Sequence, residues 1–156
     1  DRLGASNAQV FDVKHACTSW VSALDIMDSL IATGKVKCGL VTSGEYISYF
    51  VDKAIETPED LNTKLSGLTL GDAGAAAVIG PSDGRRGILK TVFQSDGREW
   101  PLAVIQSGGS MYGWTQPKFH STSARLLAVA ARELPPVIWK ARRELGWKPR
   151  EVDVIV

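Results

Sequence analysis

Apolar side chains recur at helical spacing directly after Cys17, with polar residues on the opposite side of the predicted helix. The apolar positions are Trp20, Leu24, Met27 and Ile31. This period predicts an amphipathic helix that starts at Cys17 and ends before Gly34, because glycine is favoured just past the end of a helix. Apolar runs at residues 10–13 and 38–43 predict a strand on either side, so the stretch predicts a right-handed βαβ unit with parallel strands.

The rest of the chain contains three more apolar runs that predict strands: residues 75–79, 88–95 and 152–156. Between the last two runs, apolar residues at helical spacing, among them Leu127 and Leu134, predict a helix over residues 121–134. The adjacent Pro135 and Pro136 predict a kink or a new start before the helical pattern continues to Gly146.

Two stretches have no regular period. Residues 45–64 mix polar and apolar positions and predict an excursion over the surface. Residues 98–120 are rich in Trp, Tyr, Gly and Pro, which favours an irregular lining of a cleft. The aromatic residues Trp100, Tyr112 and Trp114 in this stretch fit either a core or a cleft wall.

The composition narrows the possible functions. The 156 residues, 44% of them hydrophobic, suit one packed domain, and 18 basic against 17 acidic residues give a net charge of +1. A charge this balanced predicts neither a nucleic acid nor a membrane surface as a partner. Two cysteines, no signal peptide and no apolar run of about 20 residues predict a reducing, cytoplasmic location without a membrane span.

Both ends of the sequence predict that it belongs to a longer chain. It starts at Asp1 rather than at a methionine, and it stops within the apolar run at residues 152–156. A domain rarely ends on an apolar strand, so we expect further residues on both sides. The isolated 156 residues are then expected to expose sheet edges and to be inactive.

Cys17 is the candidate for covalent chemistry. It is predicted in the first turn of a helix, where unpaired N–H groups and the positive end of the helix dipole favour a thiolate. A lone cysteine is also commonly an inert core residue, and this is the expectation for Cys38, which lies in an apolar run. His15 is two residues from Cys17 and is expected to be structural or channel-lining rather than a general base.

Three segments in this order resemble the thiolase-like condensing enzymes, nearest to the β-ketoacyl synthase III group. They are Phe11-Asp-Val-Lys-His-Ala-Cys-Thr-Ser19, Leu40-Val-Thr-Ser-Gly-Glu45 and Leu70-Gly-Asp-Ala-Gly-Ala-Ala-Ala-Val78. A weaker match continues through residues 94–97 and 124–146 to residues 152–156, so the resemblance covers nearly the whole chain.

The resemblance implies an α/β fold with α/β/α/β/α layers, of which this chain holds a part. Residues 1–80 match the latter part of the N-terminal half, which carries the nucleophile. Residues 81–156 match the first part of the C-terminal half, which stops before the family's catalytic histidine. That histidine is expected just after Val156, and the family's asparagine is expected further on. The full-length protein is expected to be a homodimer.

In this family, a cysteine accepts an acyl group from a thioester of coenzyme A or acyl carrier protein. A malonyl-type thioester then loses CO2 and condenses with the acyl-enzyme. The resemblance implies that Cys17 is the acceptor, with its own N–H as half of an oxyanion hole. By position, Lys64 resembles a basic residue near the nucleotide end of coenzyme A, and Ser123 replaces a glycine beside the acyl and pantetheine channel. No metal and no redox cofactor is implied.

Three alternatives remain open on the sequence. The first is a non-catalytic partner subunit with the same fold. The second is a thiolase-like acyltransferase that transfers acyl groups without decarboxylative condensation. The third alternative is an α/β binding module in which Cys17 is an ordinary core residue. Residues downstream of Val156 and the reactivity of the Cys17 thiol distinguish these alternatives.

Overall fold

The computed structural model describes residues 3–84, 86–107, 110, 113 and 116–154. The chain forms two compact units: one combines residues 1–43 with residues 74–87, and the other combines residues 44–73 with residues 88–156. These units are defined by contacts within this chain. The division into two family halves at residue 80 stays a prediction.

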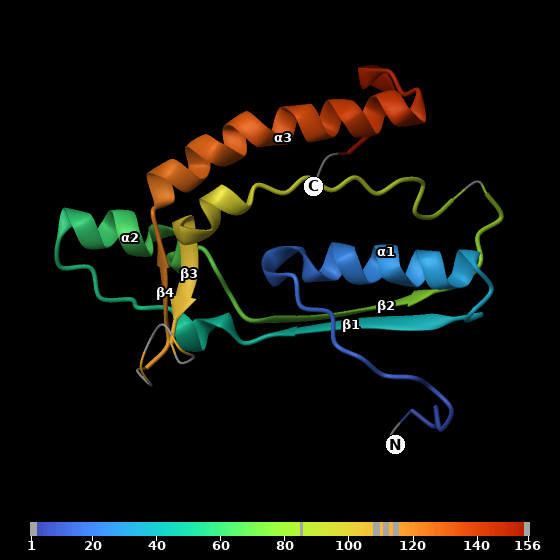
Figure 1. Ribbon diagram of the computed structural model, residues 1–156, viewed down its shortest axis with the longest axis horizontal. Helices are drawn as coiled ribbons and strands as arrows, with labels where there is room; N and C mark the ends of the chain where they lie inside the picture. The colour runs from blue at the N-terminus through green and yellow to red at the C-terminus, as the bar shows by residue number, and fades with distance from the viewer. Residues whose placement is uncertain (1–2, 85, 108–109, 111–112, 114–115, 155–156) are drawn as a thin grey trace. The chain divides into compact units, whose positions relative to one another are not determined.

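In the first unit, the helix predicted after Cys17 is confirmed as α1, Ser19–Ala32 (Figure 1). It ends as the sequence predicts, because Gly34 takes a left-handed conformation with φ +71°. The Gly34 N–H donates to the carbonyl of Ile31 at 2.9 Å, and the Lys35 N–H donates to the carbonyl of Leu30 at 3.0 Å. These bonds use carbonyls that the last helical turn leaves unpaired.

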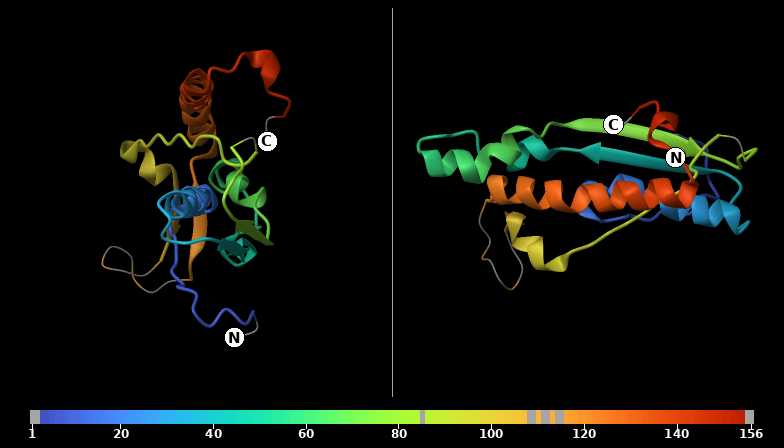
Figure 2. Two further views of the ribbon diagram at one scale, coloured as in Figure 1. Left: turned by 90° about the vertical axis from the view of Figure 1, so that its right-hand side faces the viewer. Right: turned by 90° about the horizontal axis from the view of Figure 1, so that it is seen from above.

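Strands β1 (Gly39–Glu45) and β2 (Ala73–Ile79) form a two-stranded sheet and confirm two of the predicted strands. Figure 2 shows the two arrows pointing in opposite directions. The predicted parallel βαβ unit is wrong for this structure, because its first strand is missing. Residues 10–13 are extended without strand pairing, and β1 pairs with β2 instead. Val10 is 90% exposed, and a strand without a neighbour has no partner for its N–H and C=O groups.

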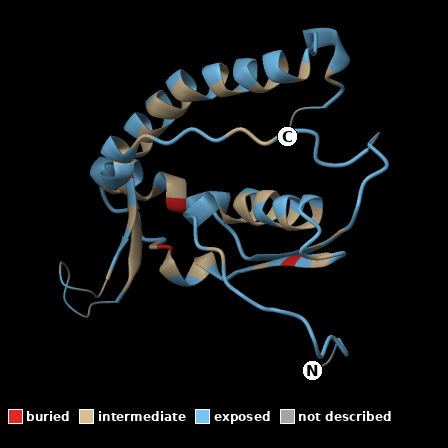
Figure 3. Ribbon diagram, turned by 45° about the vertical axis from the view of Figure 1, so that its right-hand side comes forward, coloured by how far each residue is buried: buried red, intermediate tan, exposed pale blue. Residues whose placement is uncertain are grey.

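Helix α1 meets β1 through a methionine and a glycine. A β-carbon at Gly39 would lie 2.0 Å from the sulfur of Met27, so the absence of a side chain lets the two elements approach closely. Two residues further along β1, Val41 is only 6% exposed. The half-buried residues of α1 include the four apolar positions that the sequence placed on its inner face (Figure 3).

The second unit contains a helix that sequence analysis missed. Residues 45–64, predicted as a surface excursion, form a short 3₁₀ turn at Ile47–Phe50 and the start of α2, Pro58–Leu68. Thr57 caps α2: its hydroxyl accepts the Asp60 N–H at 3.0 Å, and the Asp60 carboxylate accepts the Thr57 N–H at 3.0 Å. This reciprocal box, followed by proline at the first helical position, is a start signal that was readable in the sequence.

Residues 98–120 are more regular than predicted. A 3₁₀ turn at Gly97–Leu102 leads into β3 (Ala103–Gln106), which pairs antiparallel with β4 (Lys118–Ser121). In this pairing Ala103 lies opposite Ser121 and Gln106 lies opposite Lys118. The Gly and Pro content of the stretch hid these two short strands from sequence analysis. Trp100 is 58% exposed, whereas Tyr112 and Trp114 lie outside the described residues.

Helix α3, Ser123–Leu145, runs without a new start through Pro135 and Pro136, contrary to one of the two predicted outcomes (Figure 1). The physical reason is that its half-buried positions continue at helical spacing across both prolines, which keeps one face of the helix in contact with the unit. Leu127 and Leu134, predicted to face inward, are 71% and 56% exposed. The helix ends at Gly146, where φ is +69°.

Two further predicted strands are wrong within the described residues. Residues 88–95 and 152–154 carry no strand pairing, and residues 155–156 of the last run lie outside the described part. Apolar character alone does not make a strand, because a strand also has to pair along its length with a neighbouring strand. A short 3₁₀ turn at Pro149–Glu151 lies between α3 and the last of these segments.

Few side chains among the described residues are deeply buried, as the small amount of red in Figure 3 shows. The side chains with the lowest exposure, 5–8%, are those of Val41, Val51, Leu102 and Ser121. In the second unit, α2 packs against β4 and α3. Gly67 of α2 lies close to Phe119 of β4, where an added β-carbon would be 3.2 Å from the ring. Among the described residues, no helix has both the length and the apolar character that crossing a membrane requires.

Candidate active site

Cys17 lies at the middle of a 3₁₀ turn, Ala16–Thr18, that leads directly into α1. Sequence analysis placed it inside the first helical turn, so the structure sets it two residues earlier. Its thiol is free and exposed. An exposed thiol at the entrance of a helix is accessible to an electrophile, which an inert core cysteine is not.

The residue before Cys17 has an unusual backbone. Ala16 has φ +46°, and among the described residues it is the one non-glycine residue with positive φ. For a residue with a β-carbon the left-handed region costs about 1–2 kcal/mol, so other contacts have to hold the chain there. Strain of this kind is concentrated at functional sites.

Hydrogen bonds on both sides of Ala16 hold this conformation. The Ser19 hydroxyl accepts the N–H of His15 at 2.8 Å and donates to the carbonyl of Ala16 at 2.7 Å. The carbonyl of His15 accepts both the hydroxyl of Thr18, at 2.8 Å, and its N–H, at 3.1 Å. Four backbone groups around Ala16 are therefore bonded within the turn: the N–H and carbonyl of His15, the carbonyl of Ala16 and the N–H of Thr18.

The start of α1 has no side-chain cap. Thr18 is the N-cap residue, but its hydroxyl bonds back to His15 and makes no capping bond to the helix. The first turn of α1 also carries no acidic residue. The positive end of the helix dipole is thus not neutralised by a side chain of that turn.

His15 and Cys38 are the other two residues weighed in the sequence. The imidazole Nδ1 of His15 lies 2.7 Å from the hydroxyl of Ser22, on the second turn of α1, consistent with the structural role expected for His15. The expectation that Cys38 belongs to the core is wrong: its thiol is exposed, because β1 begins at Gly39 and leaves Cys38 just before the strand.

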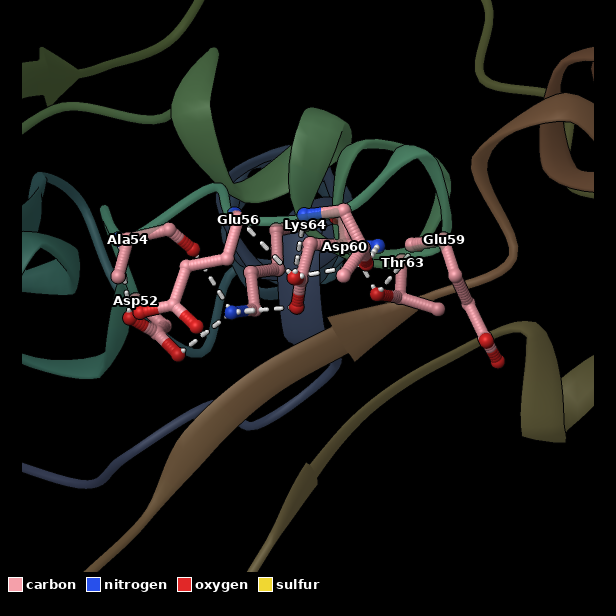
Figure 4. A network of polar contacts seen from close by, with 8 residues as sticks. Asp52, Ala54, Glu56, Glu59, Asp60, Thr63 and Lys64 are labelled. Carbon is pink, nitrogen blue, oxygen red and sulfur yellow. Dashed lines mark hydrogen bonds and ion pairs between the residues drawn. The ribbon is translucent and has the colours of Figure 1, made fainter.

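Lys64 of α2 holds a compact ion-pair cluster (Figure 4). Its ammonium lies 3.0 Å from a carboxylate oxygen of Asp52 and 2.8 Å from one of Asp60, and it donates to the carbonyl of Ala54 at 2.8 Å. The Lys64 side chain is only 13% exposed. Its bonds tie the loop before α2 to the helix, and a phosphate would have to compete with two carboxylates for it. The predicted contact of Lys64 with coenzyme A stays a prediction.

The same cluster predicts how stability depends on pH. Bonds from Lys64 and then Thr57 lower the pKa of Asp60 from 3.8 to about 2. A carboxyl with a lower pKa in the folded than in the unfolded chain stabilises the fold above its unfolded pKa and ceases to do so as the pH falls through the folded value. The free energy of unfolding of the wild type is therefore expected to fall as the pH drops from about 4 to about 2. We expect this fall to be smaller in Asp60→Asn, because the titrating carboxyl is gone.

Urea unfolding at a series of pH values measures this difference. Glu59→Gln is the control, because the Glu59 side chain points away from Lys64 in Figure 4. The control is expected to keep the wild-type profile. If Asp60→Asn and the wild type lose stability equally over this range, the expected contribution of Asp60 is wrong.

Ser123 is the first residue of α3 and belongs to a cluster of three hydroxyls. Its oxygen lies 2.9 Å from the hydroxyl of Ser66 on α2 and 2.9 Å from the hydroxyl of Ser121 at the end of β4. It also accepts the N–H of Ser66 at 3.2 Å. The cluster joins three elements of the second unit. The predicted place of Ser123 beside an acyl channel stays a prediction.

The structure groups these residues by unit. Lys64 and Ser66 lie on α2 in the second unit, where Ser66 bonds to Ser123, and Cys17 lies in the first unit.

A hollow of about 210 Å³ at the end of α3 contains none of these residues. It is lined by Ile138, Ala141, Arg142, Leu145, Trp147 and Val152. Sequence analysis missed Ser19 and Ser22, because His15 precedes both the 3₁₀ turn and α1, so that helical spacing gave no signal for their contacts with it.

Solved structures show the fold. A crystal structure of a 3-oxoacyl-(acyl-carrier-protein) synthase III matches with a TM-score of 0.80 and 20% identity, over 97% of this chain and 48% of that chain. OleA from Xanthomonas campestris, in a crystal structure with bound lauric acid and lauroyl-CoA, matches with a TM-score of 0.74 and 21% identity, over 96% of this chain and 44% of that chain. The chain therefore has part of the thiolase-like α/β fold of the condensing enzymes.

Sequence relatives define the family more closely. The β-ketoacyl-[acyl-carrier-protein] synthase III of Aquifex aeolicus is 30% identical over 99% of this chain and 45% of its own length. That of Rhodospirillum centenum is 33% identical over 99% of this chain and 46% of its own length. The model of the 3-oxoacyl-[acyl-carrier-protein] synthase III family matches residues 11–97, and the chain belongs to this family. It spans about half the length of these relatives.

Proposed function

We propose that the protein is an acyltransferase of the β-ketoacyl synthase III type and that Cys17 is its acyl acceptor. The observation that carries the proposal is the free, exposed thiol of Cys17 in a strained turn at the uncapped start of α1. The family match includes this turn, since it covers residues 11–97. A nucleophile has to be accessible to its substrate, and the thiol of Cys17 is exposed in this turn.

In the first half-reaction, the Cys17 sulfur attacks the carbonyl carbon of an acyl thioester. A new thioester forms on Cys17, and the thiol of coenzyme A or acyl carrier protein leaves with a proton. In the second, a malonyl-type thioester loses CO2, and its carbanion attacks the carbonyl carbon of the acyl group on Cys17. A C–C bond forms to give the β-ketoacyl product, the C–S bond to Cys17 breaks, and the Cys17 sulfur leaves as a thiolate that can take up a proton. We assign no residue of this chain to the decarboxylation, and the proposed chemistry uses neither a metal nor a redox cofactor.

Three further assignments belong to the same proposal. We propose coenzyme A or acyl-carrier-protein thioesters as the acyl donors and a homodimer as the working assembly. We also propose substrate contacts for Lys64 and Ser123. Support comes from the family, whose relatives are named for acyl carrier protein, and from the OleA structure, which holds lauroyl-CoA.

Mass spectrometry tests the first half-reaction. We expect the complete protein, incubated with an acyl-CoA, to gain the mass of one acyl group, and peptide mapping is expected to place this group on Cys17. The matched control is Cys38, the second exposed free thiol, which lies outside the strained turn and is expected to stay unmodified. An adduct found only on Cys38, or no adduct on Cys17 with any acyl-CoA or acyl carrier protein thioester, contradicts the proposal.

A further inference from the structure

The cysteine turn contains more polar contacts than a helix start requires. A helix start commonly uses one side-chain cap, whereas here four side-chain hydrogen bonds lie between residues 15 and 22. None of these bonds caps α1 from its N-cap residue Thr18. Three of the bonds are made to His15, and the fourth is made to the carbonyl of Ala16. All four therefore lie next to the left-handed residue that precedes the proposed nucleophile.

The Ser19 hydroxyl has the central place in this network. By accepting the N–H of His15 and donating to the carbonyl of Ala16, it joins the backbone on the two sides of the left-handed residue. Released from these bonds, an alanine relaxes toward negative φ, because its β-carbon clashes with the backbone at positive φ. Such a relaxation rotates the peptide that carries the N–H of Cys17.

The His15 side chain anchors the same turn to the helix. Its Nδ1 is 2.7 Å from the Ser22 hydroxyl, a geometry that serves either ring tautomer, because a hydroxyl both donates and accepts. Ser22 is half-buried on the second turn of α1. The position of His15 is therefore fixed by Ser19 through the backbone and by Ser22 through the ring.

We propose that Ser19, supported by His15 and Ser22, is a positioning residue that holds Ala16 left-handed and thereby aims the Cys17 thiol for attack. This inference rests on the proposed role of Cys17 as acyl acceptor. These hydrogen bonds of the three side chains lie within the turn and the start of α1. Their loss is therefore expected to slow the reaction of the thiol without weakening the binding of the thioester.

Acylation kinetics of the complete protein test the proposal. We expect Ser19→Ala to lower the rate constant for acylation of Cys17 at saturating acyl-CoA by about three- to tenfold, the effect of losing hydrogen bonds of ordinary strength. The KM for acyl-CoA is expected to stay unchanged. Ser19→Thr keeps the hydroxyl and is expected to restore the rate, and Ser22→Ala is expected to shift it in the same direction as Ser19→Ala. Ser29→Ala, an exposed serine near the other end of α1, is the matched control.

Measuring Ser19→Ala in an Ala16→Gly variant separates a positioning role from a general loss of protein stability. Glycine adopts positive φ without a clash, so Ala16→Gly removes the strain that Ser19 opposes. In that background we expect Ser19→Ala to cost less than about twofold, because the turn no longer needs the bridge. An equal loss in both backgrounds, a wild-type rate for Ser19→Ala, or a change in KM alone overturns the proposal.

Alkylation provides a readout that does not depend on acyl transfer. The rate at which iodoacetamide modifies Cys17, read by peptide mapping, is expected to fall for Ser19→Ala and to recover for Ser19→Thr. If the wild type forms no acyl adduct, the proposed function fails, and these alkylation rates still decide the positioning role. If Cys17 is acylated equally in the wild type and in Ser19→Ala, only the positioning role fails.

Discussion

Replacement of Cys17 by alanine is expected to reduce condensation by the complete protein by roughly three orders of magnitude or more. The reason is that the acyl-enzyme cannot form without the sulfur, whereas the rest of the turn is left in place. The measurement is turnover of an acyl-CoA with a malonyl-type thioester. Because Cys17 is exposed, its truncation leaves no cavity, and thermal unfolding is expected to be unchanged.

Two variants control this experiment. Cys17→Ser keeps the size of the side chain but replaces the thiol by a hydroxyl that is a much weaker nucleophile at neutral pH, so it is expected to be inactive as well. Cys38→Ala removes the other exposed thiol and is expected to turn over at the wild-type rate. Retention of more than about a tenth of wild-type turnover by Cys17→Ala would show that acyl transfer uses another group.

Truncation of Leu102 is expected to have the largest effect on stability. Leu102 ends the 3₁₀ turn before β3 and is only 5% exposed, and its carbonyl accepts the N–H of Thr122 at 2.9 Å. Leu102→Ala removes buried methyl groups and leaves a cavity. We expect the free energy of unfolding to fall by about 2–5 kcal/mol, as for other buried leucines.

The same substitution at an exposed leucine is the control. Leu127 lies on α3 in the same unit and is 71% exposed, so Leu127→Ala is expected to change the free energy of unfolding by less than about 0.5 kcal/mol. Denaturant unfolding of both variants gives the comparison. Equal effects at the two positions would mean that the core of the second unit is not centred on Leu102.

Elements with a strong local signal could be predicted from the sequence. The helix after Cys17 was readable because its apolar residues recur at helical spacing and Gly34 ends it with a left-handed residue. Strand β2 was readable as a compact run of small and branched residues. Helix α2 had an equally local signal, the box of Thr57 and Asp60 with proline between them, but mixed polarity hid it.

Elements that depend on distant partners could not be predicted in the same way. Residues 10–13 are apolar enough for a strand but form none in this structure, because a strand exists only where another strand completes its hydrogen bonds. The hairpin of β3 and β4 was missed, because residues 98–120 were predicted to be irregular. Its pairing joins residues about fifteen positions apart, and neither strand has an alternation of apolar and polar residues that would indicate it.

For the candidate site, the sequence by itself determined the residue types and the order of motifs: a cysteine at a helix start and the segments that resemble the condensing enzymes. Residue types and order are local properties, and the family match confirms the resemblance that they indicated, whereas the role of Cys17 stays a prediction. Only the tertiary structure decided the left-handed Ala16, the bridging hydroxyl of Ser19 and the ion pairs that surround Lys64. Each of these depends on how the backbone folds back on itself, because hydrogen bonds and ion pairs form only when the fold brings their atoms within about 3 Å.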